Sequence, residues 1–494
     1  MNSRLALAAT FILSCGLCAC EKALPDFATA GEHAAELTTT KNASIGEYLV
    51  DYDMVSYDFG DECKDYFAGL VSSWLDRDLF DKVYSILFEG RVQALQSQME
   101  KEGAERTGRV EVYTIRYNSL STKGEPIVLS ACVVLPNFES ENGRSHTLND
   151  ITLYTDYWKS YDEYVTLDGC PEFIRSLYNQ AVVISDYEGY GVTQSEVHPF
   201  SSFMELGQQC IDCELAAFEL LSEIGAGLKK DAGTYVMGMS KGAPVSMAVS
   251  KLLKTSCSEK TSSKINLKST YCCSGPYDLS AISESYRTIG QTDENNWIFP
   301  FMAIGAYYTD PAFKEDGFGL GDFFCDKFNE TAATDSRILQ QLLTKEAYQS
   351  RLNSAYNEHG FKCIQDVVNP RFFKEDGTFN REDALAGPFF SYLERENPAT
   401  GWTPTRPVLI EYSKDDTFCP YETTHNSYLE LRSSDTISGI PNFNVVEHVY
   451  SGINHETMTT IGIVRTILLE NPVKGILSNI IDGFDTYSYV GEDF

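Results

Sequence analysis

The sequence is short of positive charge. Its 494 residues include 39 Lys and Arg against 71 Asp and Glu, which gives a formal net charge of -32. Nucleic acids and anionic membrane surfaces would repel a chain this acidic. The composition therefore argues against both as partners.

Long apolar runs are missing beyond the N-terminus. A helix that crosses a bilayer needs about 20 mainly apolar residues, and no later stretch meets that requirement. Low-complexity tracts are absent too. With 43% hydrophobic residues, the body of the chain is predicted to be globular, with one large core or a core and a sizeable insertion.

The N-terminus has the pattern of an export signal. Arg4 precedes an apolar run from Leu5 to Leu17, which is too short to span a membrane comfortably. The residues Leu17-Cys18-Ala19-Cys20 resemble a bacterial lipobox, in which the last cysteine is lipidated after cleavage. Residues 1–19 are therefore predicted to be a lipoprotein-type signal peptide, with Cys20 as the lipidation site.

Two alternatives remain for this segment. One is a simple secretory signal with incidental cysteines, and the other is lipidation at Cys15. Residues 20–45 are small and polar, as expected of a flexible tether. The protein is predicted to be exported and lipid-anchored to the cell envelope. Glu21 favours the outer membrane, because it does not resemble an inner-membrane retention signal.

Eleven cysteines follow Cys20, an odd number that leaves at least one free thiol. Cys210 and Cys213 have the spacing of a metal or redox motif, but no second thiol pair or histidine pair lies near them in the sequence. A structural zinc site needs four ligands. This favours buried thiols, and neither a metal nor another cofactor is predicted.

The first part of the mature chain is predicted to contain a helical segment and a hairpin. Residues 46–105 are assigned as helical, because apolar residues recur at helical spacing between Asp61 and Glu102. The segment from Arg109 to Tyr117 alternates like a strand, a turn follows, and Pro126 to Pro136 has the pattern of a second strand. These two strands predict an antiparallel hairpin.

Beyond the hairpin, short apolar strands alternate with helical stretches. This alternation predicts an α/β fold with a mostly parallel sheet that helices cover on both faces. Residues 106–280 and 406–494 would form this core. Residues 281–405 interrupt the alternation over too long a distance for a loop, and are predicted to form an inserted, mainly helical cap domain. The expected strands are Ile151–Thr155, Ala181–Ser185, Thr234–Met237, Ile265–Cys273, Pro407–Tyr412 and Phe443–Tyr450, and the expected helices are Ser202–Leu228, Lys241–Leu253, one near Tyr421 and one after His455.

One short motif indicates nucleophilic chemistry. Gly238-Met239-Ser240-Lys241-Gly242 matches Gly-x-Ser-x-Gly, follows an apolar strand and leads into a helical pattern with Pro244 in its first turn. A sharp turn there lifts the serine hydroxyl clear of the sheet, and glycines on both sides avoid clashes. The motif resembles the nucleophile elbow of the α/β-hydrolases and makes Ser240 the candidate nucleophile, the alternative being a glycine-rich strand end.

A serine hydroxyl needs a base, and the base needs an acid that orients it. In α/β-hydrolases the chain order is Ser, then Asp or Glu, then His, each at the end of a later strand. Asp416 follows the strand-like run Val408–Ser413 and is the preferred acid, with Asp415 as its rival. The alternative for either is a loop carboxylate in solvent.

His455 is the preferred base. It lies just after the last predicted strand, where a helix begins. The other six histidines lie in the tether, before the serine, in the cap, in a helix or inside a strand: His33, His146, His198, His359, His425 and His448. The alternative for His455 is an ordinary residue at a helix N-terminus.

Two backbone groups are expected to form an oxyanion hole. One donor would be the N–H of Lys241, the residue after the nucleophile. The second would come from the loop after the Ile151–Thr155 strand, where Tyr157 is the candidate.

With these residues in place, the chain resembles the secretory lipase and esterase branch of the α/β-hydrolases from about Arg109 to the C-terminus. The sequence departs from the family pattern at Thr155-Asp156-Tyr157, where such enzymes usually carry His-Gly. Besides the elbow, it includes the loop Lys414–Pro420, similar to Gly-x-x-Asp-x-x-Val-Pro, the segment Ser274–Leu279, and Asp186–Gly191 followed by His198-Pro199-Phe200.

This resemblance implies hydrolysis of a small-molecule ester or lipid through an acyl intermediate on Ser240. His455 would move the proton and Asp416 would hold its tautomer. A peptidase of the prolyl-oligopeptidase type shares the fold and residue order, but no seven-fold repeat for its usual propeller precedes the elbow. An alternative of another class is a surface binding protein without catalytic activity, built on the same fold.

Overall fold

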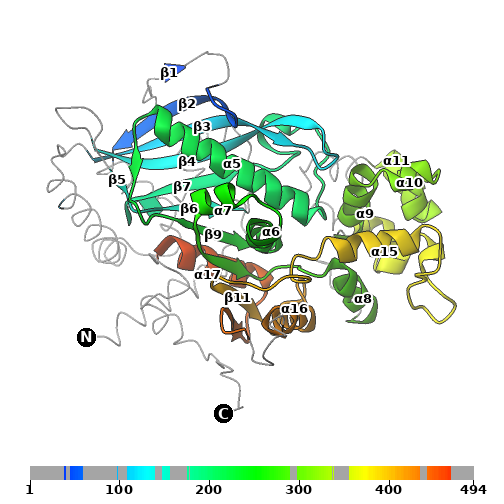
Figure 1. Cartoon of the computed structure of the whole chain (residues 1–494). Coiled ribbons are helices and arrows are strands. Elements are labelled where there is room, and N and C mark those ends of the chain that lie inside the picture. The colour runs from blue at the N-terminus through cyan, green and yellow to red at the C-terminus, as the bar shows by residue number, and fades with distance from the viewer. Residues whose placement is uncertain are drawn as a thin grey trace, which may run out of the picture.

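A ten-stranded sheet forms the centre of the molecule (Figure 1). In the computed structural model its strands lie in the order β1-β2-β3-β4-β7-β6-β9-β10-β11-β12. Pairing is antiparallel from β1 to β7 and parallel from there to β12. The residues that the structure describes are 38–39, 45–58, 97, 108–138, 147–155, 175–176, 178–289, 298–335, 338, 355–433 and 442–468.

The strands and helices of the sheet layers agree closely with the alternation expected from the sequence. The strands are β1 (Thr38–Thr39), β2 (Leu49–Asp58), β3 (Gly108–Leu120), β4 (Pro126–Phe138), β6 (Asp150–Tyr154), β7 (Gln180–Ser185), β9 (Thr234–Met239), β10 (Leu267–Cys273), β11 (Val408–Ser413) and β12 (Val445–Tyr450), with β5 (Thr147–Leu148) and β8 (Gly227–Leu228) as a separate pair. The helices beside them are α5 (Phe203–Glu223), α6 (Gly242–Thr255), α7 (Glu259–Ile265), α16 (Tyr421–Ser433) and α17 (His455–Leu468).

The parallel half of the sheet is buried on both faces. Every residue of β7 and of β11 is buried, as the continuous apolar runs in their sequences predict. Adjacent residues of β10 show the two faces: Cys272 packs in a cluster with Ala243 of α6, whereas Cys273 lies against Gly462 of α17. Successive side chains of a strand point to opposite faces, so α6 and α17 cover opposite sides of the sheet.

The antiparallel half contains both a confirmed and a corrected expectation. β3 and β4 pair along their whole length as the predicted hairpin. Residues 46–105 were expected to be helical, but the segment begins with strand β2, Leu49–Asp58, which pairs with β3. Pairing with β3 decides the structure of residues 49–58. The helical spacing that led to the prediction lies further along the segment and carries no information about this pairing. Residue 97 is helical, and the rest of that segment lies outside the described residues.

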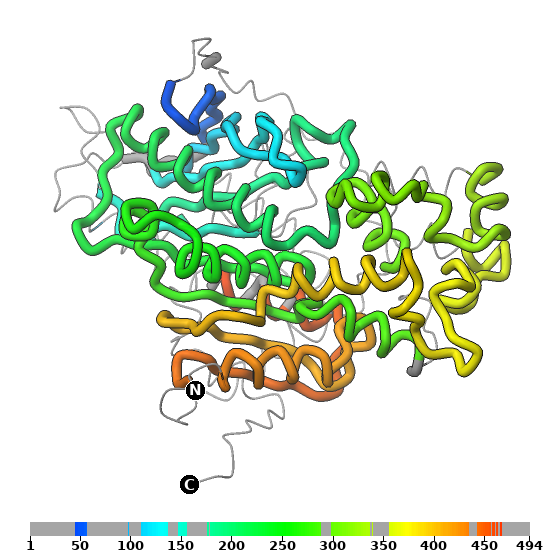
Figure 2. The backbone as a smooth tube through the Cα atoms, turned by 45° about the vertical axis from the view of Figure 1, so that its right-hand side comes forward, coloured from blue at the N-terminus to red at the C-terminus, as the bar shows by residue number. Residues whose placement is uncertain are grey.

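Helices occupy the chain between β10 and β11. In Figures 1 and 2 they gather together at one end of the molecule, beyond the sheet. Their core is aromatic: the ring of Phe299 lies 5.3 Å from Phe389 and 5.7 Å from Phe372, centroid to centroid. These helices are α8 (Leu279–Ile289), α9 (Ile298–Thr309), α10 (Ala312–Glu315), α11 (Asp326–Thr334), α14 (Ile364–Val367) and α15 (Ala386–Arg395).

This helical insert contacts the loop that follows β7. The Phe200 ring lies 5.5 Å from the Phe301 ring of α9. The hydroxyl of Ser202 lies 2.7 Å from that of Tyr392 on α15 and 2.9 Å from that of Thr309. Among the described helices, none is both long and apolar enough to cross a membrane.

Candidate active site

Ser240 lies at the turn between β9 and α6, as the motif predicts. Its backbone has φ +50°, in the left-handed region that residues other than glycine rarely adopt. The turn is fixed by hydrogen bonds from the Ser240 N–H to the Cys273 carbonyl, 2.8 Å, and from the Ala243 N–H to the Ser240 carbonyl, 3.0 Å. This strained turn leaves the side chain half-buried at the carboxyl end of the central strand β9.

Gly238 is required by the tightness of this turn. A Cβ atom there would lie 2.2 Å from the Gly242 carbonyl oxygen and 2.6 Å from Thr155 Oγ1. The Thr155 hydroxyl donates a hydrogen bond of 2.8 Å to the same carbonyl. Thr155, which follows β6, therefore supports the elbow. A side chain larger than glycine at position 238 would collide with this contact.

His455 and Asp416 converge on the serine. Ser240 Oγ lies 2.9 Å from His455 Nε2, and His455 Nδ1 lies 2.8 Å from Asp416 Oδ2. A carboxylate can only accept, so Nδ1 carries the hydrogen and Nε2 is free of one and can accept the serine proton. Three side chains distant in sequence thus form one hydrogen-bonded chain.

The surroundings of Asp416 hold its carboxylate in one orientation. Oδ1 accepts from the backbone N–H groups of Phe418, 2.9 Å, and Cys419, 2.8 Å. Oδ2 accepts from the Ser274 hydroxyl, 2.9 Å, in addition to His455. The rival Asp415 is exposed and accepts instead from the Gly452 N–H, 2.6 Å.

His455 is the first residue of α17. Asn454 begins the helix, because its side-chain oxygen accepts from the Thr457 N–H at 3.0 Å. The imidazole packs against the Phe418 ring, 4.5 Å between centroids. The helix start and the aromatic contact together fix the ring between serine and carboxylate.

The remaining predicted site residues are only partly described. Lys241 follows Ser240 and is the N-cap of α6, so its backbone lies at the elbow as expected. Tyr157 and Cys20 lie outside the described residues. Cys210 and Cys213 are buried free thiols on α5, as their spacing without a second pair of ligands favours.

One group of side chains in the described part of the chain has metal-ligand spacing, formed by Asp416, Cys419 and His455. A thiol binds metal as the thiolate, but burial above all, and then the nearby Asp416, raises the pKa of Cys419 well above its usual value. Its Sγ donates to the Ser274 carbonyl at 3.1 Å. These groups fit a hydrogen-bonded network better than a metal centre.

A buried ion pair that the sequence does not predict lies behind the site. Arg465 of α17 donates to Glu411 of β11 at 3.0 Å, and both side chains are almost completely buried. Tyr450 donates to the same carboxylate at 2.8 Å. The pair ties the helix that begins with His455 to the strand that leads to Asp416, but nothing in the local sequence indicates the contact.

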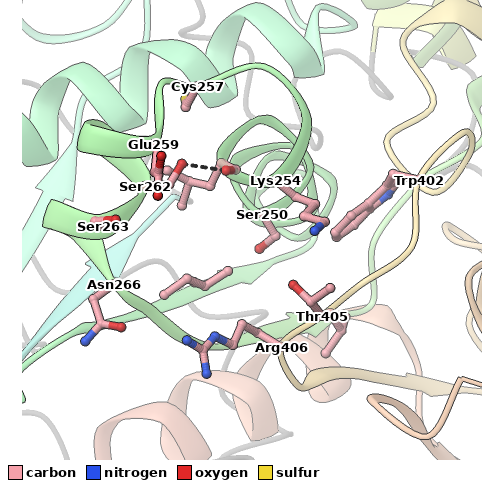
Figure 3. A pocket seen from close by; sticks show the side chains of 13 residues that line it. Ser250, Lys254, Cys257, Glu259, Ser262, Ser263, Asn266, Trp402, Thr405 and Arg406 are labelled. Atoms are coloured by element: carbon pink, nitrogen blue, oxygen red, sulfur yellow. Dashed lines mark hydrogen bonds between the residues drawn. The ribbon is translucent and has the colours of Figure 1, made fainter.

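A depression of about 550 Å³ lies away from the Ser240 site (Figure 3). Asn266, just before β10, and Val408, the first residue of β11, both line it. It therefore lies at the amino edge of the parallel strands, whereas Ser240 follows the carboxyl end of β9. This depression is separate from the serine site.

Comparisons with known proteins give matches at the level of structure. No protein-family model and no curated protein matches the sequence. The rice cell wall degrading esterase LipA from Xanthomonas oryzae is similar in structure, with TM-score 0.55 and 18% identity over 76% of this chain and 92% of that one. The chain has the α/β-hydrolase fold.

Two further solved structures share this α/β-hydrolase fold. A putative hydrolase from Legionella pneumophila has TM-score 0.57 and 15% identity over 85% of this chain and 96% of that one. Lipase A of Candida antarctica has TM-score 0.51 and 15% identity, covering 76% of this chain and 78% of the lipase. Ser240 lies at the strand-to-helix turn of this fold, and its Oγ is 2.9 Å from His455 Nε2.

Proposed function

We propose that the protein is a serine hydrolase that cleaves carboxylic esters through an acyl-enzyme on Ser240. The observation that carries the proposal is the hydrogen-bonded chain from Ser240 Oγ through His455 to Asp416, at a strained turn between strand and helix. A hydroxyl, an imidazole and a buried carboxylate in this order are the parts that acyl transfer requires.

In the acylation step, His455 Nε2 accepts the Ser240 proton as Oγ attacks the ester carbonyl. The negative charge that develops on the carbonyl oxygen would be stabilised by the N–H of Lys241 at the start of α6, and by a second donor for which Tyr157 is our candidate. The imidazolium then donates its proton to the leaving alcohol, which leaves the acyl-Ser240 ester.

Deacylation repeats the sequence with water. His455 accepts a proton from the water that attacks the acyl carbonyl, and returns it to Ser240 as the acid leaves. Asp416 stabilises the imidazolium and holds its orientation. The two backbone N–H groups on its Oδ1 keep the carboxylate from rotating away.

The esterase and lipase neighbours support an ester as the substrate class. The helical insert, which packs on the loop after β7, is proposed to act as a cap that bounds the acyl-binding space. Wild-type protein is expected to hydrolyse p-nitrophenyl acyl esters and to leave Xaa-Pro amides intact. Amide turnover without ester turnover would replace the esterase with a peptidase.

For the N-terminus we propose a lipid anchor on Cys20 and a place in the cell envelope, on the strength of the lipobox-like sequence. Cys20→Ser is expected to lose incorporation of labelled palmitate and to leave the membrane fraction. Cys15→Ser is the matched control and should keep both. The reverse pattern would move the lipidation site to Cys15.

A further inference from the structure

The side chain of Lys241, the residue after the nucleophile, is buried inside the protein. Only 7% of the residue is exposed. Its ammonium nitrogen contacts Nε2 of His198, and lies 4.3 Å from the centre of the Tyr187 ring and 5.5 Å from that of Phe200. A lysine here is unusual, because burying an ammonium group costs free energy unless close partners compensate it.

Hydrogen-bond chemistry fixes the direction of this contact. His198 Nδ1 lies 2.7 Å from the Glu188 carbonyl oxygen, which can only accept, so Nδ1 carries the hydrogen. In the neutral imidazole Nε2 is then an acceptor, and the Lys241 ammonium donates to it. A single directed chain runs from the nucleophile elbow to the backbone of the loop between β7 and α5.

The acceptor end of this chain is held rigidly. His198 is 3% exposed, and its ring contacts two tyrosine rings, that of Tyr187, stacked at 5.8 Å, and that of Tyr190, edge-on at 4.8 Å. Gly189 has φ +89°, and a Cβ there would lie 2.7 Å from the His198 Cα. The glycine therefore makes the space into which the histidine backbone packs.

The carbonyl that anchors the histidine belongs to a residue that is itself fixed. The Glu188 carboxylate accepts from the Thr122 N–H at 2.7 Å and from Gln209 Nε2 at 3.1 Å. These bonds connect the loop to the β3–β4 hairpin and to α5. Phe200, the other neighbour of the ammonium, packs on Phe301 of the helical insert.

We propose that Lys241 and His198 form a positioning pair that holds the backbone N–H of Lys241 in the direction needed to stabilise the oxyanion. This inference rests on the proposed function. Anchoring the Lys241 side chain matters because the neighbouring backbone is strained at Ser240. The Lys241 N–H must also point at the position of the oxyanion and not at that of the ground-state carbonyl oxygen. The His198–Lys241 contact supplies a fixed point one residue from the nucleophile.

Loss of the pair should act on the transition state more than on substrate binding. Removing one oxyanion donor lowers kcat by about 10²–10³-fold. If the donor stays in place but points in the wrong direction, kcat should fall by part of that factor. For Lys241→Met, which keeps an unbranched side chain but removes the ammonium, we expect kcat to fall roughly 10–100-fold and KM to stay within about threefold.

The test measures kcat, KM and the thermal midpoint for p-nitrophenyl ester hydrolysis, together with the Ki of an aryl trifluoromethyl ketone, whose serine adduct carries an oxyanion. For Lys241→Met, Ki is expected to rise in proportion to the fall in kcat/KM. Lys254→Met is the matched control, because Lys254 is an exposed residue on the same helix α6 and lines the separate depression. It should leave every constant unchanged.

His198→Phe keeps an aromatic ring against Tyr187 and Tyr190 and removes the acceptor. It should lose as much kcat as Lys241→Met, and the double variant should lose no more than either one. If Lys241→Met does not accumulate as folded protein, the kcat and Ki of His198→Phe test the positioning role instead. A lower thermal midpoint with kcat and Ki unchanged would overturn the positioning role, whereas absence of wild-type turnover and of Ser240 labelling would overturn the proposed function instead.

Discussion

At the scale of single residues, two adjacent carboxylates in the loop after β11 have different surroundings. Asp416 is 3% exposed and accepts hydrogen bonds from His455, Ser274 and two backbone N–H groups. Asp415 is exposed and braces the turn at Gly452. Of the two carboxylates, only that of Asp416 contacts the His455 imidazole and can orient it.

Asp416→Asn should therefore lower kcat by on the order of 10⁴-fold with little change in fold, because an amide facing Nδ1 favours the wrong tautomer. Asp415→Asn is the matched control and should retain activity within about threefold. Steady-state ester hydrolysis by both variants makes the comparison. Equal losses would remove Asp416 from the mechanism.

The sequence predicted which three side chains, Ser240, His455 and Asp416, the structure joins in one hydrogen-bonded chain, because each follows a strand in the order that the fold requires. It did not indicate the residues that hold them. Ser274 reaches Asp416 from another strand, 142 positions away along the chain, and His198 reaches Lys241 over 43 positions. Such contacts depend on side-chain direction in the folded sheet, which no local pattern encodes.

At the scale of elements, the turn between β9 and α6 depends on Gly238. Gly238→Ala places a methyl group 2.2 Å from the Gly242 carbonyl oxygen, so the helix start must shift. We expect a loss of about 2 kcal/mol or more in the free energy of unfolding, with loss of ester turnover. Gly321→Ala, whose Cβ meets only a side chain at 3.6 Å, is the control for denaturant titration. Equal stability of the two variants would contradict the argument.

The Glu411–Arg465 ion pair connects β11 with α17, and it makes stability depend on pH. Burial opposes ionisation of Glu411 and is the largest single effect, but the Arg465 charge and hydrogen bonds from His448 and Tyr271 together outweigh it and lower the pKa of Glu411 to about 2. A depressed pKa contributes stability that is present above the unfolded-state value of 4.5 and lost as pH falls toward 2.

Wild-type protein should accordingly lose roughly 3 kcal/mol of its unfolding free energy between pH 4.5 and pH 2 through this one group. Glu411→Gln should be less stable at pH 7, because the buried Arg465 guanidinium loses the carboxylate charge that compensates its burial, and its stability should fall less steeply in that range. Urea titrations at several pH values, with the exposed Glu430→Gln as control, measure both effects. An unchanged slope in Glu411→Gln would contradict this assignment.

At the scale of the whole molecule, the helical insert meets the core at two carboxyl groups, one buried and one half-buried. Glu396, at the end of α15, is 2% exposed and accepts from the Met204 N–H at 3.3 Å. Glu205 Oε2 on α5 is buried without a hydrogen-bond partner among the described residues. Burial first, and then the Glu205 charge, raises the pKa of Glu396 to about 8.

A raised carboxyl pKa contributes stability that is present below the unfolded value of 4.5 and lost as pH rises toward 8. Glu396→Gln keeps an acceptor for Met204 and offers Glu205 a donor, so it should raise the thermal midpoint at pH 9 and change it little at pH 4. Calorimetry at the two pH values measures this, with Glu394→Gln on the exposed side of α15 as control. A variant less stable than wild type at pH 9 would contradict the prediction.

The layered α/β architecture could be predicted because buried parallel strands such as β7 and β11 carry continuous apolar runs. The antiparallel half could be predicted only in part. The β3–β4 hairpin is local, whereas β2 lies in the segment assigned as helical and is specified by its pairing with β3. The order in which β7, β6 and β9 lie side by side likewise follows from tertiary packing.

The central claim is that Ser240 is the nucleophile of an ester hydrolase. Folded protein treated with a fluorophosphonate probe and digested for mass spectrometry should carry the adduct on the peptide that contains Ser240. Ser240→Ala should neither be labelled nor hydrolyse p-nitrophenyl esters, while keeping the thermal midpoint of wild type. An adduct on another residue, or a Ser240→Ala variant that keeps most of its turnover, would contradict the account.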